Sequence, residues 1–253
     1  MKRMLLLCAL GFGILHPALC QQAEPNRARV IFEEVDARRT AIEYERSDMQ
    51  MVIYDSKGRT RNRTLESYAF DKNDISKSLL VFQKPANVRG TGFLTLEEGT
   101  DETQKLYLPA LKKIQTIAAS QKGDRFMGSD FTYEDLGAQN PDDYELELLS
   151  ESGTEAVIKA IKTNNSAYAY MHFYVDLNRY ALTKAEYFDE SERMVKKLEA
   201  EDFQNVDGNI WRANRMTMFD LKEDRKTELS WSNRTINQAI PEWRFTERGL
   251  RRN

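Results

Sequence analysis

The stretch that decides the fold is AYAYMHFYVDL, residues 167–177, in which the side chains suit a period of two. This period predicts a β-strand, because successive side chains of a strand point to opposite faces of a sheet. One face would carry Ala167, Ala169, Met171, Phe173, Val175 and Leu177, and the other Tyr168, Tyr170, His172 and Tyr174. Both faces are largely apolar. We therefore expect packing on both sides, against a core and against a helix, lid or bound ligand, with ordinary buried packing as the simpler explanation.

Similar short runs extend outward from this strand in both directions, separated by turn-forming residues. They cover residues 41–53, 59–63, 79–82, 91–96, 105–108, 144–149, 155–161, 181–188, 194–203, 209–221 and 226–231. Charged residues make up 30% of the 253 residues and apolar residues 41%, which is typical of a globular protein and too apolar for general disorder. The sequence predicts a mainly β protein of about eleven strands, with few helices and no linker.

A short amphipathic helix is predicted before the first strand, from Pro25 to about Arg39. Val30, Ile31 and Val35 recur there among charged residues at a helical spacing. The helix would have only a modest apolar face.

Three arginines follow the turn Asp55-Ser56-Lys57-Gly58 at every second position, at Arg59, Arg61 and Arg63. In a strand they would project from one face of the sheet. A solvated face is the favoured interpretation, and contact with lipid headgroups or with a partner protein is the alternative.

The first twenty residues have the layout of a secretory signal peptide: two basic residues, an apolar run from Leu5 to Leu15 and small residues near Cys20. Cleavage after Cys20 is the favoured processing, and lipidation of Cys20 is the alternative. The only other cysteine is Cys8, inside the leader, so the mature chain could form no internal disulfide. A secreted protein without disulfides points to a bacterial periplasm, with residues 21–253 as one domain.

Charge and residue types argue against several classes of function. Loss of Lys2 and Arg3 with the leader would change the formal charge from −3 to −5, which disfavours a nucleic-acid binder. His172 would be the only histidine of the mature chain, so zinc sites of His and Cys and the usual nucleophile–histidine pairs are disfavoured. No phosphate-binding or dinucleotide-binding glycine motif is present. We expect no metal, no cofactor and no enzymatic activity.

The segment RFMGSDFTYEDLG, residues 125–137, combines three acidic residues with glycines and large apolar side chains. Asp130, Glu134 and Asp135 could form the acid pair of a hydrolase. Acidic residues at this spacing also stabilise the start of a helical turn, and this interpretation is favoured. The turn would run from Ser129 or Asp130 to Leu136 and end at Gly137.

Three blocks together resemble the LolA-like family of outer-membrane lipoprotein-sorting proteins. They are LVFQKPANVRGTGFLTLEE (80–98), KLYLPALKKIQTIAAS (105–120) and RFMGSDFTYEDLG. A weaker resemblance covers the hairpin around Gly58 and the closing pattern TELSWSNRTINQAIPEWRFTERGL. The resemblance implies one strongly curved antiparallel sheet that forms an incomplete, half-open barrel, with short helices covering an apolar cavity that accepts acyl chains.

The function implied by this resemblance is a periplasmic carrier of a lipid or lipoprotein, working as a monomer towards the outer membrane. An inner-membrane exporter and an outer-membrane acceptor are the implied partners. An envelope sensor or exporter-accessory module on the same fold is the alternative, and a hydrolase is less favoured. Candidate cavity or lid residues are Met51, Ile53, Phe82, Phe93, Leu106, Leu108, Phe126, Met127, Phe131, Tyr168 and Tyr170, most of which suit an ordinary core equally well.

Overall fold

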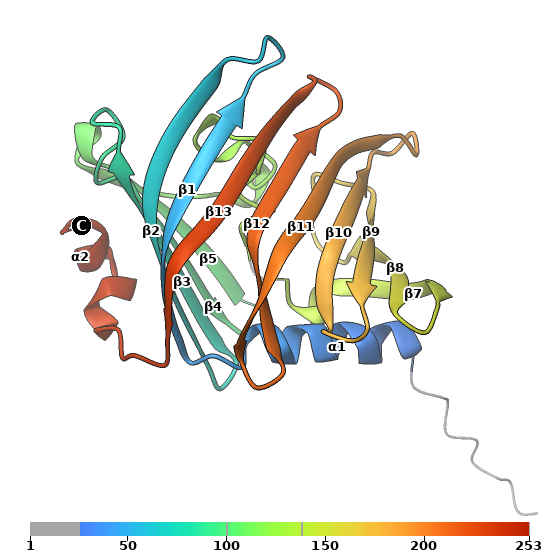
Figure 1. The fold of residues 1–253 in the computed structure, drawn as a ribbon. Helices are drawn as coiled ribbons and strands as arrows, with labels where there is room; N and C mark the ends of the chain where they lie inside the picture. The colour runs from blue at the N-terminus through green and yellow to red at the C-terminus, as the bar shows by residue number, and fades with distance from the viewer. Residues whose placement is uncertain (1–25, 100, 138, 253) are drawn as a thin grey trace, which may run out of the picture.

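One antiparallel sheet contains every strand of the described residues, and it curves into a deep trough (Figure 1). The structure is a computed structural model that describes residues 26–99, 101–137 and 139–252. The strand order is β6-β5-β4-β3-β2-β1-β13-β12-β11-β10-β9-β8-β7. The predicted signal peptide and Cys20 lie outside the described residues.

Chain neighbours pair along both arms of the sheet, and the two arms meet where β1 pairs with β13. The strands are β1 Tyr44–Tyr54, β2 Thr60–Lys72, β3 Ile75–Lys84, β4 Gly92–Glu98, β5 Asp101–Leu108, β6 Lys113–Thr116, β7 Tyr144–Glu151, β8 Glu155–Lys162, β9 Tyr170–Asp176, β10 Ala181–Phe188, β11 Met194–Asp207, β12 Ile210–Asp220 and β13 Arg225–Ile236. The helices are α1 Arg27–Arg39 and α2 Glu247–Leu250, and the 3₁₀ turns are η1 Pro109–Leu111, η2 Ala119–Gln121, η3 Phe126–Gly128, η4 Pro141–Asp143 and η5 Glu242–Phe245.

The predicted mainly β, half-open architecture is confirmed, but the number of strands is wrong. The described residues form 13 strands rather than about eleven, and β6 and β7 remain as free edges of an unclosed sheet. Strand β6 escaped the prediction because it has only four residues, none of them buried. A strand that short and that exposed gives no periodic signal.

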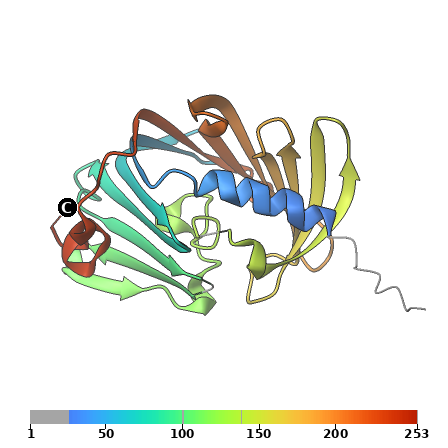
Figure 2. The ribbon, with the colours of Figure 1, turned by 90° about the horizontal axis from the view of Figure 1, so that it is seen from below.

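Helix α1 crosses the open side of the trough (Figure 2). Asn26 caps its first turn, accepting hydrogen bonds from the backbone N–H groups of Ala28 and Arg29. Arg38 and Arg39 stand in the last turn, where positive charge stabilises the negative end of the helix dipole. The predicted helix is confirmed, although its inward face differs: Ala28, Ile31 and Phe32 are buried, Val35 is partly buried and Val30 is exposed.

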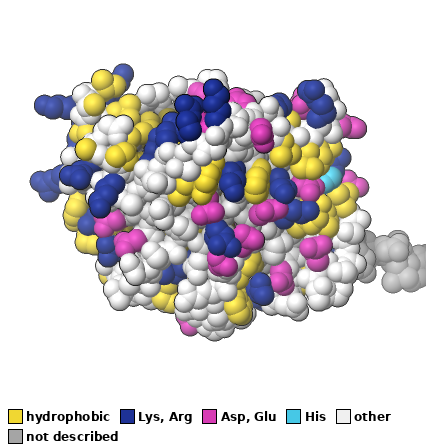
Figure 3. Space-filling view, turned by 45° about the horizontal axis from the view of Figure 1, so that its top comes forward, with side chains coloured by type: hydrophobic (Ala, Val, Ile, Leu, Met, Phe, Trp, Pro, Cys, Tyr) yellow, Lys and Arg dark blue, Asp and Glu magenta, His cyan; other side chains and the backbone are white. Residues whose placement is uncertain are grey.

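The stretch that predicted the fold forms β9, whose inner residues Met171, Phe173 and Val175 are buried. On the outer face of β9, side chains of neighbouring strands occupy the place where a helix, lid or bound ligand was expected. Lys184 lies 3.5 Å from the centre of the Tyr174 ring, and Lys159 lies 4.7 Å from that of Tyr170. Long charged side chains therefore cover this half-buried outer face. Figure 3 shows acidic and basic groups interspersed on this side of the molecule.

The C-terminal segment packs on the outside of the trough, as Figure 2 shows. Ile240, Phe245 and Leu250 form a second apolar cluster with outward-facing residues of β2, β3 and β4. Gly92 of β4 permits this contact, because a Cβ atom there would lie 2.7 Å from Cδ2 of Leu250. The two faces of this arm are thus both buried, the inner one against the main core and the outer one against the chain end.

Candidate apolar interior, its covering segments and an acidic pocket

The inner face of the trough carries one large apolar cluster, which contains most of the candidate cavity residues. Met51, Ile53, Phe82, Phe93, Leu106, Phe126, Phe131 and Tyr168 are buried in it, and Leu108 and Met127 pack against it. The sheet brings these ten residues together although they come from four strands, the segment after β6 and the segment before β9. Two segments cover the cluster: α1 over the β7–β11 arm, and residues 125–137, here called the latch, over the other arm.

Tyr170 is not part of this cluster. It lies on the outer face of β9, stacked on Phe188 with ring centroids 4.6 Å apart. Tyr168 was predicted to share its face, but β9 begins only at Tyr170, and the Tyr168 ring turns inward, 4.7 Å from that of Tyr187. The alternation fails there because Tyr168 precedes the strand.

The latch inserts Phe126 into the centre of an aromatic group. The Phe126 ring lies 4.9 Å from Phe93, and 5.8 Å from each of Phe82 and Tyr133, between ring centroids. These separations are within the range of favourable aromatic pairs. The turn that aims Phe126 inward uses Gly128 at φ +74° and Met127 at φ +49°, and glycine adopts such values without a steric cost.

Asp130 fastens the middle of the latch to β13. Its side chain is fully buried, and its Oδ2 accepts a hydrogen bond of 2.6 Å from the Thr227 hydroxyl. Thr227 in turn accepts from the backbone N–H of Asp130 at 2.9 Å. Nε of Arg225 lies 3.2 Å from Asp130 Oδ1, an ion pair without hydrogen-bond alignment. A charge this deeply buried requires such partners.

Lys196 of β11 fastens the latch on its other side. Its ammonium donates to the backbone carbonyl of Asp130 at 2.8 Å and to the Tyr168 hydroxyl oxygen at 3.0 Å, and it lies 3.4 Å from Asp135. The Tyr168 hydroxyl donates to Asp135 at 3.0 Å. Burial, together with the negative charge of Asp135, raises the pKa of Tyr168 well above its ordinary value. The phenol therefore remains a donor at neutral pH.

Glu134 fixes the end of the latch, and this third acid is also fully engaged. It accepts hydrogen bonds from the Ser166 hydroxyl at 2.6 Å and from the backbone N–H of Ala167 at 2.8 Å, with Lys162 at 3.7 Å. A hydrogen-bonded turn does end at Gly137, but it begins at Tyr133 instead of at Ser129 or Asp130 as predicted, and it is not a helix. The acids of the latch thus hold it to the sheet and are poorly placed to meet a substrate.

Two of the three predicted arginines lie on the inner face of β2. Arg63 is 9% exposed, with its guanidinium 5.6 Å from the centre of the Phe82 ring and no carboxylate at ion-pair distance among the described residues. Burial, and repulsion from Arg61, lower its pKa. Arg61 is exposed and donates to the carbonyl of Gly128 at 3.3 Å. Arg59 lies in the turn before β2 and pairs with Asp55 at 2.6 Å.

Helix α1 covers the other arm through Phe32. Its ring stacks on that of Phe173, with centroids 5.3 Å apart and planes 2° from parallel, and meets Tyr144 edge-on at 5.8 Å. The strands beneath carry small side chains at Ala156, Ala160 and Ala185, all of them buried. A helix that rests on alanines leaves room for another apolar occupant if it moves away.

Polar contacts hold the two ends of α1. The ion pairs at its N-terminal end are exposed, although Arg29 also donates a part-buried hydrogen bond to the Pro141 carbonyl at 3.0 Å. Arg27 pairs with Glu151 at 2.6 Å, and Arg29 pairs with Asp142. At the C-terminal end, Arg212 of β12 donates to the carbonyls of Arg38 and Arg39 at 3.1 and 2.8 Å. Exposed ion pairs contribute only about 0–1 kcal/mol each. The ion pairs that hold the N-terminal part of α1 are therefore weaker than the buried ones that hold the latch.

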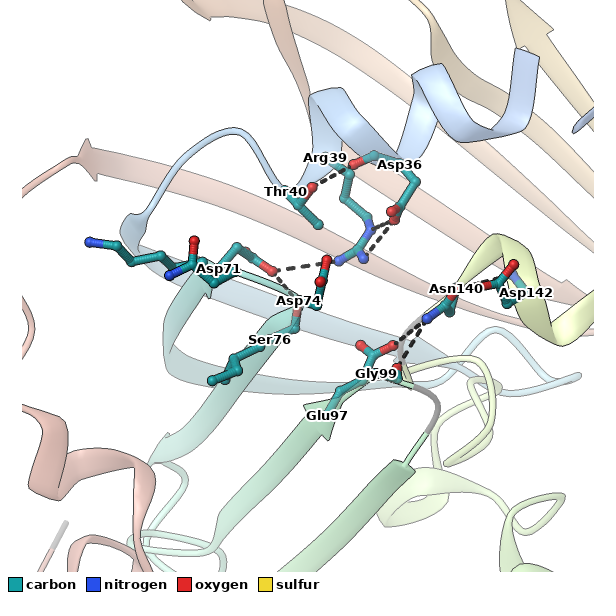
Figure 4. A pocket seen from close by; sticks show the side chains of 13 residues that line it. Asp36, Arg39, Thr40, Asp71, Asp74, Ser76, Glu97, Gly99, Asn140 and Asp142 are labelled. Carbon is teal, nitrogen blue, oxygen red and sulfur yellow. Dashed lines mark hydrogen bonds and ion pairs between the residues drawn. The ribbon is translucent and has the colours of Figure 1, made fainter. Parts of the chain in front are cut away.

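An acidic pocket of about 470 Å³ lies beyond the C-terminal end of α1 (Figure 4). It is bounded by the end of α1, the β2–β3 turn, the end of β4 and the segment around Asn140. Its lining is Asp36, Arg39, Thr40, Asp71, Lys72, Asn73, Asp74, Ile75, Ser76, Glu97, Gly99, Asn140 and Asp142.

Glu97 is the least compensated acid of this pocket. It is 8% exposed, and burial raises its pKa to about 7, although the nearby charge of Arg39 opposes the rise. Burial likewise raises the pKa of Asp71, with the Ser76 hydroxyl and Arg39 opposing. Sequence reasoning missed this pocket. The only signal was the alternation Phe93, Thr95, Glu97, which continues an apolar strand face into polar residues.

Residues 26–99, 101–137 and 139–252 contain no group of three or more His, Cys, Asp or Glu placed to hold a metal ion. Within the same residues, no helix is long and apolar enough to cross a membrane.

Comparison with known proteins finds one family model and several solved structures that are similar to the chain. A protein-family model described only as an uncharacterized protein matches residues 74–252, more than half of the chain. A domain from Vibrio parahaemolyticus, described as an outer membrane lipoprotein-sorting protein, is 28% identical, with a TM-score of 0.84 over 89% of this chain and 98% of its own. No match was found among curated proteins.

Two further solved structures show the same fold at lower identity. A DUF1329 family protein from Desulfovibrio piger is 24% identical, with a TM-score of 0.82 over 88% of this chain and 97% of its own. A LolA superfamily protein from Nitrosomonas europaea is 20% identical, with a TM-score of 0.67 over 87% of this chain and 97% of its own. The trough with its covering segments is thus a recurring arrangement.

Proposed function

Because the chain belongs to the uncharacterized family whose model it matches, and is similar to an outer-membrane lipoprotein-sorting protein domain, we propose that it is a non-enzymatic carrier of acyl chains on a LolA-like fold. It would bind a lipid or lipoprotein in the apolar interior of the trough and carry it through the periplasm towards the outer membrane. The observation that carries this proposal is the unequal fastening of the two covering segments: the latch is held by buried ion pairs, whereas the N-terminal part of α1 is held by exposed ones. Helix α1 is then the lid, and the latch is fixed.

The free energies of burial favour replacement of α1 by an acyl chain over the apolar interior. Opening α1 exposes Ala28, Ile31 and Phe32, and a large apolar side chain loses about 1.5–3 kcal/mol on exposure. An acyl chain gains about 0.8 kcal/mol for each CH₂ that it buries, so a dozen methylenes contribute on the order of 10 kcal/mol. A bound chain can therefore replace the lid. Release requires an acceptor that binds the lipid more tightly than the interior does.

An inner-membrane exporter that loads the carrier and an outer-membrane acceptor that unloads it are the partners proposed for this cycle, with the carrier as a monomer. The alternative is an envelope sensor or exporter-accessory module on the same fold, which would keep one protein partner and shuttle no lipid. Crosslinking in envelope fractions separates the two, because a sensor would return a single stable partner.

Locking α1 onto the sheet is expected to abolish uptake of a fluorescent fatty acid. Arg27→Cys and Glu151→Cys place thiols on two exposed positions whose side chains now meet at 2.6 Å, and a short bis-maleimide can bridge them. Cys8→Ser and Cys20→Ser remove the native thiols. Uptake should fall at least about tenfold after bridging and stay unchanged in the unbridged variant, because only the bridge prevents the lid from opening. Native mass spectrometry of gently purified protein should also detect acyl-bearing cargo.

The matched control bridges Arg215→Cys to Glu201→Cys, another exposed pair, at 3.0 Å between β12 and β11. This bridge joins adjacent strands and leaves α1 free, so uptake should be normal. Full uptake by the lid-bridged protein would refute the role of α1. A clean apo mass together with no probe uptake by the wild-type protein would refute lipid carriage itself.

Replacing Arg59, Arg61 and Arg63 with glutamine is expected to slow lipid transfer several-fold with little change in acyl-chain uptake. Arg61 and Arg63 have no carboxylate partner among the described residues, and Arg61 is exposed beside the latch, so its guanidinium remains available to a phosphate headgroup or an acidic partner. Transfer between donor and acceptor vesicles measures the effect, and Arg193→Gln, at an exposed turn, is the control. Transfer at the wild-type rate would refute a role of these arginines in headgroup or partner contact.

A further inference from the structure

The acidic pocket at the end of α1 has more negative charge than its own cations neutralise. Arg39 pairs with Asp36 at 2.8 Å and lies 3.9 Å from Asp71, while Arg29 takes Asp142. The other cation of the lining, Lys72, forms an ion pair at 3.0 Å with Glu43, which lies outside the pocket. Glu97 and Asp74 have no cation at ion-pair distance among the described residues. A positively charged ligand is therefore the complement of this lining.

Three buried oxygens at the end of β4 and β5 lack hydrogen-bond partners within the described residues: Glu97 Oε2, Thr95 Oγ1 and Gln104 Oε1. Their residues are 8%, 4% and 1% exposed. Thr95 and Gln104 are cross-strand partners, and Glu97 follows two positions along the same face of β4, so the three oxygens belong to one patch. Leaving buried polar atoms unpaired is costly, about 1–3 kcal/mol each. Such a patch suits a ligand rich in donors.

Glu97 joins this patch to the pocket. It lines both the main pocket and an adjoining one of about 210 Å³ that also contains Thr95 and Gly137. Its other oxygen accepts from Asn140 Nδ2 at 3.5 Å, which holds the side chain from one side only. In Figure 4 the Glu97 carboxylate rises from the end of β4 into the space below Arg39 and Asp74.

We propose that this pocket binds a primary alkylammonium group, with Glu97 as its anionic anchor. An ammonium ion offers one positive charge and three hydrogen-bond donors in a compact head, which match one unpaired carboxylate and further unpaired acceptors. A guanidinium is planar and wider, and an anion would meet uncompensated carboxylates. The site goes beyond acyl-chain carriage, because it lies outside the apolar interior and does not need the lid to open.

Calorimetric titration of the full chain with spermidine and with ethanolamine at pH 8 tests the site. Glu97→Gln should weaken binding at least about tenfold, since glutamine keeps the size and the Asn140 contact but not the charge. Glu147→Gln, at an exposed glutamate of β7, is the control and should bind as the wild type does. Equal binding by Glu97→Gln, or no binding of either amine and of any amine lipid, would overturn the proposal.

The source of the ammonium is distinguished by a second pair of probes. Lysophosphatidylethanolamine carries the group on a lipid, and lysophosphatidylcholine carries a methylated ammonium without N–H donors. Binding of the first that exceeds that of the second and requires Glu97 identifies a lipid headgroup as the ligand. Glu97-dependent binding of the free amines alone identifies a small soluble amine.

Amine binding should strengthen by several-fold as the pH rises from 6 to 8 and should lose this dependence in Glu97→Gln. The pKa of Glu97 is raised to about 7 by burial, so a proton competes with the amine below that pH. The charged groups around Glu97 are Asp36 and Arg39 of α1, Asp71 and Lys72 at the end of β2, Asp74 of the β2–β3 turn, Glu102 of β5 and Asp142. Of these, Asp71 also has its pKa raised by burial, so a dependence that persists in Glu97→Gln would assign the titration to Asp71 and refute the anchor.

The melting temperature separates an anchor from a structural carboxylate. Without ligand, Glu97→Gln should melt at or above the wild-type temperature at pH 8, because it removes a buried charge that no cation neutralises. Added spermidine should raise the melting temperature of the wild type only. A marked fall in the melting temperature of the ligand-free variant would show that Glu97 supports the fold and would refute its role as an anchor.

Discussion

Asp130→Ala is expected to lower the free energy of unfolding by about 3–5 kcal/mol, the usual loss when one partner of a buried ion pair is removed. The substitution leaves the Arg225 guanidinium without its nearest carboxylate and the Thr227 hydroxyl without its acceptor, and both side chains are largely buried. Asp130→Asn keeps an acceptor for Thr227 and should lose less, about 1–2 kcal/mol. Urea unfolding monitored by circular dichroism measures both.

The control for Asp130 is Glu201→Ala, which breaks an exposed ion pair with Arg215 and should change the stability by less than about 1 kcal/mol. A wild-type stability for Asp130→Ala would contradict the role of the latch as a fixed segment. The same variants address the hydrolase alternative. If Asp130→Asn abolished a measured turnover while leaving the melting temperature unchanged, the acids of the latch would need a catalytic interpretation.

Phe126→Ala is expected to destabilise the protein by a similar amount, about 3–5 kcal/mol, because it leaves a cavity among well-packed rings. Phe126 is fully buried, and three aromatic rings lie within 5.8 Å of its centroid. The latch around it is held by Asp130, Lys196 and Glu134, so it cannot readily collapse into the space. Thermal and urea unfolding measure the loss.

Comparison with Phe32→Ala distinguishes the fixed segment from the lid. Phe32 is also buried, but it belongs to α1, whose exposed N-terminal ion pairs allow the helix to move. We expect Phe32→Ala to raise the rate of fatty-acid uptake, whereas Phe126→Ala should change stability without a faster uptake. Leu111→Ala, at a side chain that is 67% exposed, is the control and should be neutral in both measurements. Faster uptake by Phe126→Ala alone would reverse the assignment of lid and latch.

Much of the fold could be predicted because a strand produces a period-two pattern among residues that are close together in the sequence. The alternation in residues 170–176 and the turn at Gly58 each predicted an element that the structure contains. Prediction failed where the local signal is weak: β6 is short and exposed, and Tyr168 precedes the strand whose alternation it was assigned to. A pattern of period two cannot say where a strand begins.

The candidate site could be predicted only in part. Apolar residues such as Met51, Phe82 and Phe93 were candidates for the interior because the family resemblance implies an apolar cavity, and the structure brings them together. The acidic pocket could not be foreseen, since its carboxylates come from α1, β2, β4 and the segment around Asn140. An acid in a sequence gives no sign of how deeply it will be buried or which cations will reach it.

By itself, the sequence determined the mainly β class, the open curved sheet through its family resemblance, and the helix ahead of the first strand. These depend on side chains close together in the chain. Only the tertiary structure decided what AYAYMHFYVDL faces, which acids are neutralised and which segment can move. Lys196 and Thr227 meet the latch from 66 and 97 residues away, and Glu97 is left without a cation because Arg39 pairs elsewhere. Contacts across such separations are fixed by packing, which no local pattern encodes.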